Sequence, residues 1–363
     1  MAPRTAGLIA VSLIGLSAAL SVLGAARAGR PHEPVASGLA LDAPLPDRVP
    51  SGVSLTIGDP VTELALKLSG LERELPFQVK WARITGGPAV TEAFHARALD
   101  VGSAADMPPI HATWVGMPVK IVALRLREDP VQHPLYELAV APGASVAKPA
   151  DLKGKRIAYS PGQVQGEVVL RTLAAAGLTA KEVRLVELPS TSADVYIGAL
   201  AGGLVDVAPI GAGAAAKRYL DRYGAAGAKV LRHPPFRDDL TLLYVREETL
   251  RDPGKAAALR AYVRLWGRAQ AWIDRHPDAW TQAWYVRNQG LSPGDAAYSA
   301  AAAGRSRTPR DWTEAITLEQ AAIDLMAGPT GRRRFAAEDL FDRRFEALAA
   351  EGATDVARDV ASR

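Results

Sequence analysis

The stretch Gly102-Ser103-Ala104-Ala105-Asp106-Met107-Pro108-Pro109 decides the expected fold of this chain. It follows the short pair Asp100-Val101 and precedes a helical run, residues 110–115. A turn of small residues between a strand and a helix leaves backbone N–H groups without partners and aimed at one spot. The two prolines suit the first turn of that helix, where a missing N–H costs nothing. We therefore expect a strand-turn-helix unit that can hold a small polar or anionic group.

Units of the same kind lie on both sides of this stretch. Upstream of it, alternating apolar residues and helical spacing predict two strand-helix pairs, over residues 53–75 and 77–97. Downstream, a further strand is expected at 119–124. A second series restarts the pattern over about 142–235, and from 253 onward the chain is mostly helical. Strands that alternate with helices favour parallel α/β sheets with right-handed crossovers. Two α/β blocks and a helical return indicate two lobes.

The composition excludes several classes of function. At 363 residues, the chain is long enough for two domains of about 150 residues each. Its net charge of +4 is spread over 43 basic and 39 acidic residues, too diffusely for a nucleic-acid surface. The absence of cysteine excludes disulfides, thiolate metal sites and cysteine nucleophiles. The six histidines are scattered without metal-binding spacing, so we expect no metal and no cofactor.

The N-terminus predicts export from the cytoplasm. Residues 1–28 combine Arg4, an apolar run and an Ala26-Arg27-Ala28 cleavage site, as a signal peptide does. The run is close to the length that spans a bilayer, so an uncleaved anchor is the alternative. No cysteine follows it, which excludes a lipoprotein. We therefore expect a periplasmic or extracytoplasmic protein, with residues 29–52, rich in Pro, Ala and Gly, as a flexible tether.

Beyond these patterns, a series of motifs from Val53 to about Glu351 resembles one protein family. The motifs are Thr85-Gly86-Gly87-Pro88, residues 98–102, residues 103–112, Ala150-Asp151-Leu152-Lys153-Gly154-Lys155-Arg156-Ile157-Ala158, residues 200–207, His276-Pro277-Asp278-Ala279 and Gly290-Leu291-Ser292-Pro293. Their order and spacing are similar to those of the substrate-binding proteins of ABC importers in the aliphatic sulfonate/nitrate/taurine group. In two places the chain departs from the family. The Asp and Gly of residues 98–102 are rearranged, and Gly211 stands where many relatives carry an aromatic or Asp-Pro-Tyr-like element.

The resemblance implies the type II periplasmic-binding fold, with two α/β lobes, a two-strand hinge and a ligand cleft between the lobes. The chain would cross between lobes near Ala139-Val140-Ala141 and His233–Asp239. The first lobe would then comprise 53–140 plus 239–351, the second 141–238, and residues 352–363 would form a C-terminal tail. The implied protein is a monomer, not an enzyme. It captures a small anionic organic solute, such as a sulfonate or taurine, by lobe closure and delivers it to the permease and ATPase of the importer.

The expected ligand-binding residues follow the strand ends, where helix N-termini of both lobes offer backbone N–H groups to an anion. In the first lobe they are Pro60, Thr62, Gly86, Gly87, Ala105, Asp106 and Met107. In the second lobe they are Gly162, Gln163, Val164, Gln165, Ile210 and Gly211.

Several of these residues have alternative interpretations. Asp106 either accepts an amine of a zwitterionic ligand or caps the following helix, because a carboxylate facing an anion is unfavourable. Gln163 and Gln165 either donate to ligand oxygens or lie in solvent, and Thr62 either contacts ligand or begins its helix. Glycine at position 211 removes a side-chain wall and predicts a roomier pocket. The tryptophans of the helical return are interpreted as lobe packing: Trp266, Trp272, Trp280 and Trp284.

Two other classes of function remain open. The first is an enzyme on the same scaffold, such as a desulfinase or a pyrimidine-synthase relative. Those resemblances imply a catalytic cysteine, which this chain lacks. The second is a periplasmic sensor or docking protein, which an uncleaved N-terminal anchor would favour. The solute itself also stays open among sulfonate, taurine, nitrate, bicarbonate, an aromatic acid and a pyrimidine.

Overall fold

The computed structural model of the protein describes residues 38–84, 86–189 and 193–361. These residues belong to one compact unit that begins at Gly38. The predicted export signal, 1–28, lies outside the described residues. Among the described residues, no helix has both the length and the apolar character needed to cross a bilayer.

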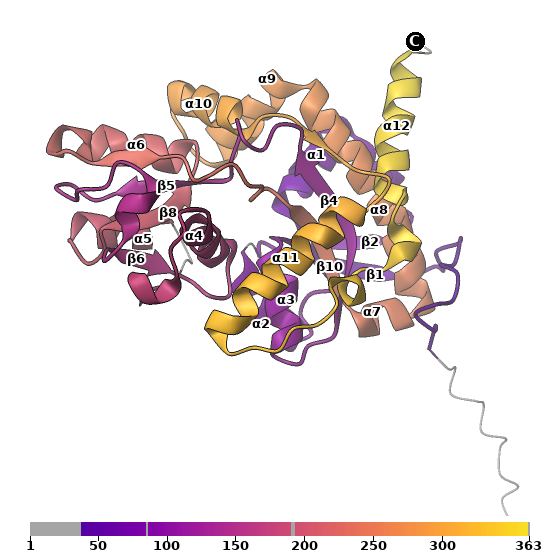
Figure 1. Ribbon diagram of the computed structural model, residues 1–363. Coiled ribbons are helices and arrows are strands. Elements are labelled where there is room, and N and C mark those ends of the chain that lie inside the picture. Colours follow the sequence, from indigo (N-terminus) through magenta and orange to yellow (C-terminus); the bar gives the residue numbers. More distant parts are fainter. Residues whose placement is uncertain (1–37, 85, 190–192, 362–363) are drawn as a thin grey trace, which may run out of the picture. The chain divides into compact units, whose positions relative to one another are not determined.

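The first of two sheets has the strand order β11-β4-β10-β3-β1-β2. Figure 1 labels β1, β2, β4 and β10 of this sheet. Its strands are β1 (Ser54–Gly58), β2 (Gln78–Trp81), β3 (Val101–Ala105), β4 (Val119–Arg127), β10 (Thr241–Arg246) and β11 (Ser306–Arg307). β1 runs parallel to β2 and β3, whereas β10 is inserted antiparallel between β3 and β4. The sheet therefore receives a central strand from late in the sequence.

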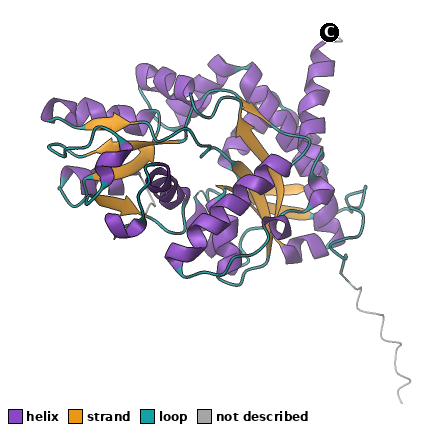
Figure 2. Ribbon diagram, viewed as in Figure 1, coloured by secondary structure: helices purple, strands orange, loops and turns teal. Residues whose placement is uncertain are grey.

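The second sheet repeats this plan with the order β7-β6-β8-β5-β9. Its strands are β5 (Tyr136–Val140), β6 (Arg156–Tyr159), β7 (Arg184–Glu187), β8 (Val207–Gly211) and β9 (Lys229–Leu231). β6 is parallel to β7 and β8, and β5 is antiparallel to β8 and β9. In each sheet the antiparallel strand follows a segment that arrives from the other sheet, so two crossings join the sheets. The prediction of two α/β lobes is confirmed, and Figure 2 shows helices packed around each group of strands.

Helices cover both sheets. Those of the first lobe are α1 (Pro60–Ser69), α2 (Gly87–His95), α3 (Met107–Trp114), α7 (Glu247–Arg251), α8 (Pro253–Arg275), α9 (Pro277–Trp280), the π-helix η5 (Thr281–Asn288), α10 (Pro293–Ala303), α11 (Thr313–Thr330) and α12 (Leu348–Ala361). Those of the second are α4 (Val164–Ala175), α5 (Ala193–Ala201) and α6 (Ala214–Tyr223). Short 3₁₀ turns complete the chain: η1 (Leu71–Glu74), η2 (Pro149–Leu152), η3 (Ala180–Glu182), η4 (Gly224–Ala226), η6 (Ala337–Leu340) and η7 (Arg343–Phe345).

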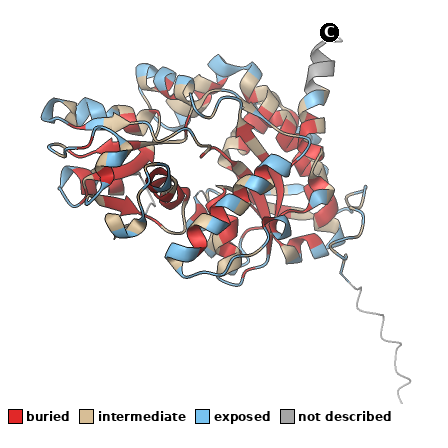
Figure 3. Ribbon diagram, viewed as in Figure 1, coloured by how far each residue is buried: buried red, intermediate tan, exposed pale blue. Residues whose placement is uncertain are grey.

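The start of α1 shows how local chemistry sets these elements. The Asp59 side chain accepts from the backbone N–H of Thr62, which satisfies one free donor of the first turn. Pro60 occupies the first helical position, and the helix ends at Gly70, whose φ of 77° suits a residue without Cβ. Apolar faces then pack on the strands, and Figure 3 shows buried positions along both sheets and the inner sides of the helices.

The quoted stretch begins as a strand, not as a turn. Residues 101–105 form β3, and a Cβ on Gly102 would lie 2.3 Å from Cγ1 of Val90. Its small residues therefore let helix α2 approach the sheet closely, a role that periodicity does not distinguish from a turn. The expected helix does follow: α3 starts at Met107, and its first turn contains the two prolines.

The first crossing lies earlier than expected. Strand β5 pairs with β8 and β9 over residues 136–140, so it belongs to the second sheet. The chain therefore crosses between Arg127 and Tyr136, and the expected crossing at Ala139-Val140-Ala141 is wrong. The second crossing, between β9 and β10, includes the expected segment His233–Asp239.

The expected tether is wrong for residues 38–52, which pack on the first lobe. The backbone N–H of Leu39 donates to the carbonyl of Arg251 at 2.7 Å, and Arg344 donates to the carbonyl of Ala43 at 2.8 Å. Apolar side chains of this segment contact the core: Leu41, Leu45 and Val49. A Pro-rich composition was consistent with a tether, but these three apolar residues are sufficient to anchor the segment.

The C-terminal region also differs from the expectation. The expected tail, residues 352–363, is not separate from the fold, because residues 352–361 form the main part of α12. Helix α12 lies so close to α8 that a Cβ on Gly267 would be 1.9 Å from the carbonyl oxygen of Ala349. On α12 itself, a Cβ on Gly352 would be 2.0 Å from the carbonyl oxygen of Arg264. Small residues at the contact let two helix backbones pack directly.

Candidate functional site

Predicted residues from the two lobes meet where the strands of the two sheets end. A Cβ on Gly87, at the start of α2, would lie 3.0 Å from Nε2 of Gln163, at the start of α4. Gly162 likewise lies against the first lobe, because its Cβ would be 3.1 Å from the His111 ring. Gln163 is the N-cap residue of α4, but its side chain makes no capping hydrogen bond to the helix. Its amide therefore lies next to Gly87 without being engaged in capping.

Gly162 lines a cavity of about 280 Å³ to which both lobes contribute. His111 and Trp114 of α3 form one side, and Tyr159 at the end of β6 and Glu187 at the end of β7 form the other. Burial, followed by the charge of nearby Arg332, lowers the pKa of His111. The neutral imidazole is thereby favoured. We call this space the interlobe pocket.

Three buried carboxyl groups gather beside these loops. Asp106 follows β3, Glu167 lies on α4 and Glu319 on α11, and all three side chains are almost fully buried. Burial, then the charges of Glu167 and Glu319, raises the pKa of Asp106 well above its usual range. Arg171 forms an ion pair with Glu167 at 2.5 Å. We call Asp106, Glu167 and Glu319 the acidic cluster.

The acidic cluster bears on the two interpretations of Asp106. Its Oδ1 accepts from the backbone N–H of Met107 at 2.7 Å, so Asp106 does cap α3. Burial and the neighbouring carboxyl groups favour the neutral form of Asp106, which counts against its interpretation as the anionic partner of a ligand amine. Sequence reasoning did not find the cluster, since Glu167 and Glu319 lie on helices remote from each other in the chain.

Gly211 is placed opposite Tyr136 in the β5–β8 pairing. A Cβ on Gly211 would meet only Ala215, at 3.9 Å, so the glycine leaves open space as expected. Burial raises the pKa of Tyr136, with further contributions from the charges of Asp238 and Asp106. Tyr136 therefore lies within electrostatic reach of both the second crossing and the acidic cluster.

Other predicted residues have buried side chains. The Thr62 side chain is fully buried, and its Oγ1 accepts from Nε2 of Gln270 at 3.0 Å, so it stabilises α1 against α8. Three more side chains belong to the core and leave only backbone atoms for a ligand: Met107, Val164 and Ile210. Pro60, Ala105, Gly86 and Gln165 are the remaining members, and Gln165 has a buried Oε1 without a hydrogen-bond partner.

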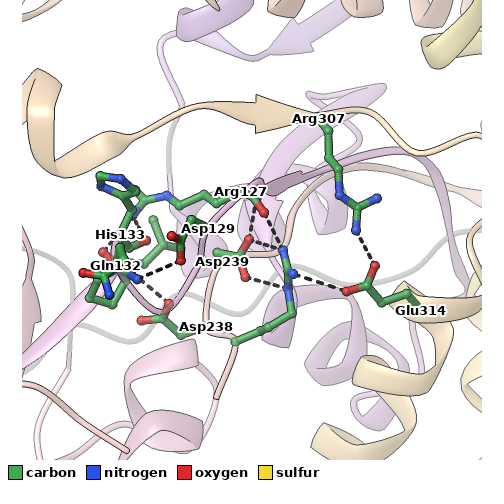
Figure 4. A network of polar contacts seen from close by, with 11 residues as sticks. Arg127, Asp129, Gln132, His133, Asp238, Asp239, Arg307 and Glu314 are labelled. Carbon is green, nitrogen blue, oxygen red and sulfur yellow. Dashed lines mark hydrogen bonds and ion pairs between the residues drawn. The ribbon is translucent and has the colours of Figure 1, made fainter. Parts of the chain in front are cut away.

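The two crossings are tied together by a polar network shown in Figure 4. The Asp238 carboxylate accepts from the backbone N–H groups of Leu135 and Tyr136 at 2.9 and 2.7 Å. Asp239 accepts from the backbone N–H of Arg127 and from the guanidinium of Arg237. Asp238 and Asp239, at the end of the second crossing, thus form hydrogen bonds to the backbone of the first crossing. The pair lay inside a predicted crossing, yet nothing in its pattern indicated this role.

A second cavity, of about 180 Å³, lies beside the crossings in the first lobe. It is bounded by the end of β4, the start of β10 and the segment from α9 to α10. Arg125, Arg127 and Arg305 supply positive charge, and Trp280, Trp284 and Tyr285 supply aromatic rings. We call it the arginine pocket. The sequence interpretation of the two tryptophans as packing residues did not foresee that they also line a cavity.

Comparisons with known proteins agree with this architecture. The family model described as NMT1/THI5 like matches residues 84–279. A curated relative, the "Putative aliphatic sulfonates-binding protein" of Escherichia coli (strain K12), is 30% identical over 115 residues, covering 31% of this chain. The match spans only about a third, 35%, of that relative's length.

Solved structures share the fold. The alkanesulfonate-binding protein SsuA from Xanthomonas axonopodis pv. citri, bound to MOPS, superposes with a TM-score of 0.62 at 20% identity, covering 85% of this chain and 99% of that one. The desulfurization enzyme DszB does so with a TM-score of 0.56 at 16% identity, covering 82% and 98%. At these identities the likeness shows the fold alone, the two-lobed fold of periplasmic binding proteins. That fold accommodates both binding and catalysis.

Proposed function

The chain belongs to the NMT1/THI5-like family, and on that premise we propose that it is an extracytoplasmic solute-binding protein of an ABC importer. It captures a small anionic organic solute, of the sulfonate or taurine kind, between its lobes and delivers it to the permease and ATPase. The partly matching sulfonate-binding relative supports this solute class. The observation that carries the proposal is the interlobe pocket, because both lobes line it and one predicted residue, Gly162, borders it.

The two crossings explain how binding would drive closure. A ligand that contacts loops of both lobes stabilises the arrangement in which those loops are close, and the crossings absorb the change. Gly87 from one lobe and Gln163 from the other already lie within contact distance. We propose that the ligand contacts come from backbone groups of Gly86, Gly87 and Gly162 and from the amides of Gln163 and Gln165. The buried side chains of Thr62, Met107, Val164 and Ile210 act as supports.

Residues 136–231 would then form the second lobe, with the preceding and following segments forming the first. We further propose export by the N-terminal signal, residues 1–28, and function as a monomer in the periplasm. Sequencing the N-terminus of the exported protein tests the signal. A start at Gly29 supports cleavage, whereas an intact Met1 favours the anchored sensor.

Binding is favoured over catalysis by the chemistry of the chain. The fold is shared with the enzyme DszB, but this chain contains no cysteine to act as a nucleophile. His111 is the imidazole of the interlobe pocket, and neither a hydrogen bond nor an ion pair joins its side chain to a carboxylate of the described residues. No base-and-nucleophile pair therefore supports an enzymatic role there.

A ligand screen on protein exported to the periplasm, unfolded and refolded to strip bound solute, tests the proposal. Alkanesulfonates, taurine, nitrate, aromatic acids and hydroxymethylpyrimidine are compared by thermal shift and calorimetry. A ligand at 100 times its dissociation constant stabilises by about 2.7 kcal/mol, which raises Tm by a few degrees. A sulfonate response that disappears in Gly162→Asp supports the proposal, and the absence of any response refutes it.

A further inference from the structure

The arginine pocket lies in the first lobe but borders both crossings. Leu135 of the first crossing and Asp239 of the second belong to its lining, together with Thr241 at the start of β10. The interlobe pocket shares none of these residues. The two cavities therefore have different linings, and an occupant of the arginine pocket would contact both segments that join the lobes.

Of the three arginines in its lining, Arg305 pairs with Glu128 at 3.7 Å, whereas Arg125 and Arg127 are held by neutral groups. Nη1 of Arg125 donates to Oε1 of Gln270 at 2.8 Å, and Nη1 of Arg127 donates to the carbonyl of Pro134 at 2.7 Å. In the described parts of the chain, no carboxylate forms an ion pair with either guanidinium. Burial lowers the pKa of Arg127, and the charges of Asp238 and Asp239 oppose that lowering. Desolvated cations are costly without an opposite charge, so an anion bound here would stabilise them.

The acidic residues of the lining do not meet this need. Asp239 is engaged by the guanidinium of Arg237 at 2.8 Å and by the backbone N–H of Arg127. Burial raises the pKa of Asp274, and the charge of Arg125 opposes that rise only in part. Asp274 lies at the edge of the pocket and forms no ion pair with Arg125 or Arg127 among the described residues.

The remaining walls offer donors and flat apolar surface. The indoles of Trp280 and Trp284 stack with centroids 5.5 Å apart and planes 7° from parallel. Neither indole N–H donates to an atom of the described residues, although both rings line the pocket. Burial raises the pKa of Tyr285, and the charges of Arg125 and Arg127 act against that rise, so the hydroxyl lies in the field of both cations. Donors and cations next to aromatic rings suit an oxyanion on a small apolar body.

We propose that the arginine pocket is a second ligand site, which binds the carboxylate or sulfonate of a small organic acid beside the crossings. The acid group lies on Arg125, and the apolar body lies against Trp280 and Trp284. Gln270 orients Arg125 from α8 and is itself held by Thr62. The site goes beyond capture of a solute between the lobes, because its occupant would touch both crossings from within one lobe.

The test is calorimetric titration of the full chain with benzoate and benzenesulfonate, using benzamide as the neutral counterpart. Thr281→Glu places a carboxylate in the pocket wall, whereas Gln282→Glu adds the same charge at the exposed neighbouring position. We expect Thr281→Glu to weaken binding of both anions by about tenfold or more, because like charges repel in a partly desolvated site, and Gln282→Glu to change it by less than about twofold. Benzamide should bind more weakly than benzoate.

A second variant, Arg125→Gln, should show the same loss for the anions with little effect on benzamide. Far-ultraviolet circular dichroism and the thermal midpoint show whether each variant folds. If Arg125→Gln does not fold, the comparison of Thr281→Glu with Gln282→Glu tests the proposal by itself. Anion binding that persists in Thr281→Glu but disappears in Gly162→Asp places the anion in the interlobe pocket and overturns this inference, leaving the proposed function intact. Absence of binding by both anions, or equal binding of benzamide and benzoate, also overturns it.

Discussion

Replacing Glu319 by glutamine is expected to stabilise the protein at neutral pH and to flatten its pH dependence. Glu319 lies on α11 with its side chain fully buried, and neither carboxyl oxygen has a hydrogen-bond partner among the described residues. Burial, and then the charge of Glu167, raises its pKa well above the usual range, and Arg171 opposes this only in part. Glutamine has nearly the same shape, carries no charge and can donate to the neighbouring carboxyl group of Glu167.

The sign follows from proton linkage. The unfolded chain releases the Glu319 proton at an ordinary carboxyl pKa, while the native protein holds it to higher pH. The stability from this group is therefore fully present below the unfolded pKa and is lost as pH rises through the folded pKa. Within that window the free energy of unfolding falls by about 1.4 kcal/mol per pH unit for this one group. Glu319→Gln removes the contribution of this group to the pH dependence of stability. A second contribution remains, because the pKa of Asp106 is also raised.

The assay is urea unfolding, followed by tryptophan fluorescence, at intervals from pH 4 to pH 8. The variant should gain stability over the wild type as pH rises, with the two curves converging toward pH 4. Glu92→Gln, at an exposed position of α2, is the matched control and should follow the wild type. Parallel curves for Glu319→Gln and wild type, or a variant that is less stable at every pH, would refute the argument that burial raises this pKa.

Three further changes test other parts of the fold. Gly267→Ala would push a Cβ into the carbonyl of Ala349, and we expect a loss of about 1–3 kcal/mol or more in urea unfolding. Asp238→Asn keeps the shape but weakens two charge-assisted hydrogen bonds across the crossings, with an expected loss of about 1–3 kcal/mol and a lower Tm in calorimetry. Gly87→Val would place a Cβ 2.5 Å from Cγ of Pro108 and 3.0 Å from Nε2 of Gln163 at the junction of the lobes, so the solute found in the screen should bind at least about tenfold more weakly by titration.

The alternation of strands and helices was enough to predict two α/β lobes, because each strand-helix pair shows its own periodicity. Sheet membership was harder to predict. Strand β5 is short and mostly apolar, and such a sequence is compatible with either sheet. Only its pairing with β8 and β9 shows that it belongs to the second sheet. The packing of residues 38–52 was missed for a similar reason, since three apolar side chains among prolines give no period.

The candidate site was predicted as a set of loops but not as an electrostatic environment. Gly87 and Gln163 were named from their positions after strands, and the structure places them in contact distance. The acidic cluster brings together Glu167 and Glu319 from two separate helices, a proximity that no local pattern encodes. The arginine pocket was missed because Arg125 and Arg127 lie in the last part of β4, a strand whose apolar residues indicate a place in the core.

The late central strand of the first sheet has a consequence for the order in which the protein can form. During synthesis, β3 and β4 emerge well before β10. These two strands do not pair with each other, because β10 lies between them and pairs with both. Until residues 241–246 are available, the first lobe lacks the strand that closes its hydrogen-bond ladder, whereas residues 136–231 are contiguous and contain every strand of their sheet. The first lobe therefore cannot join β3 to β4 until about two thirds of the chain has been made. The export that we propose for this chain would benefit from that delay, because a first lobe that has not completed its sheet is easier to thread through a translocation channel.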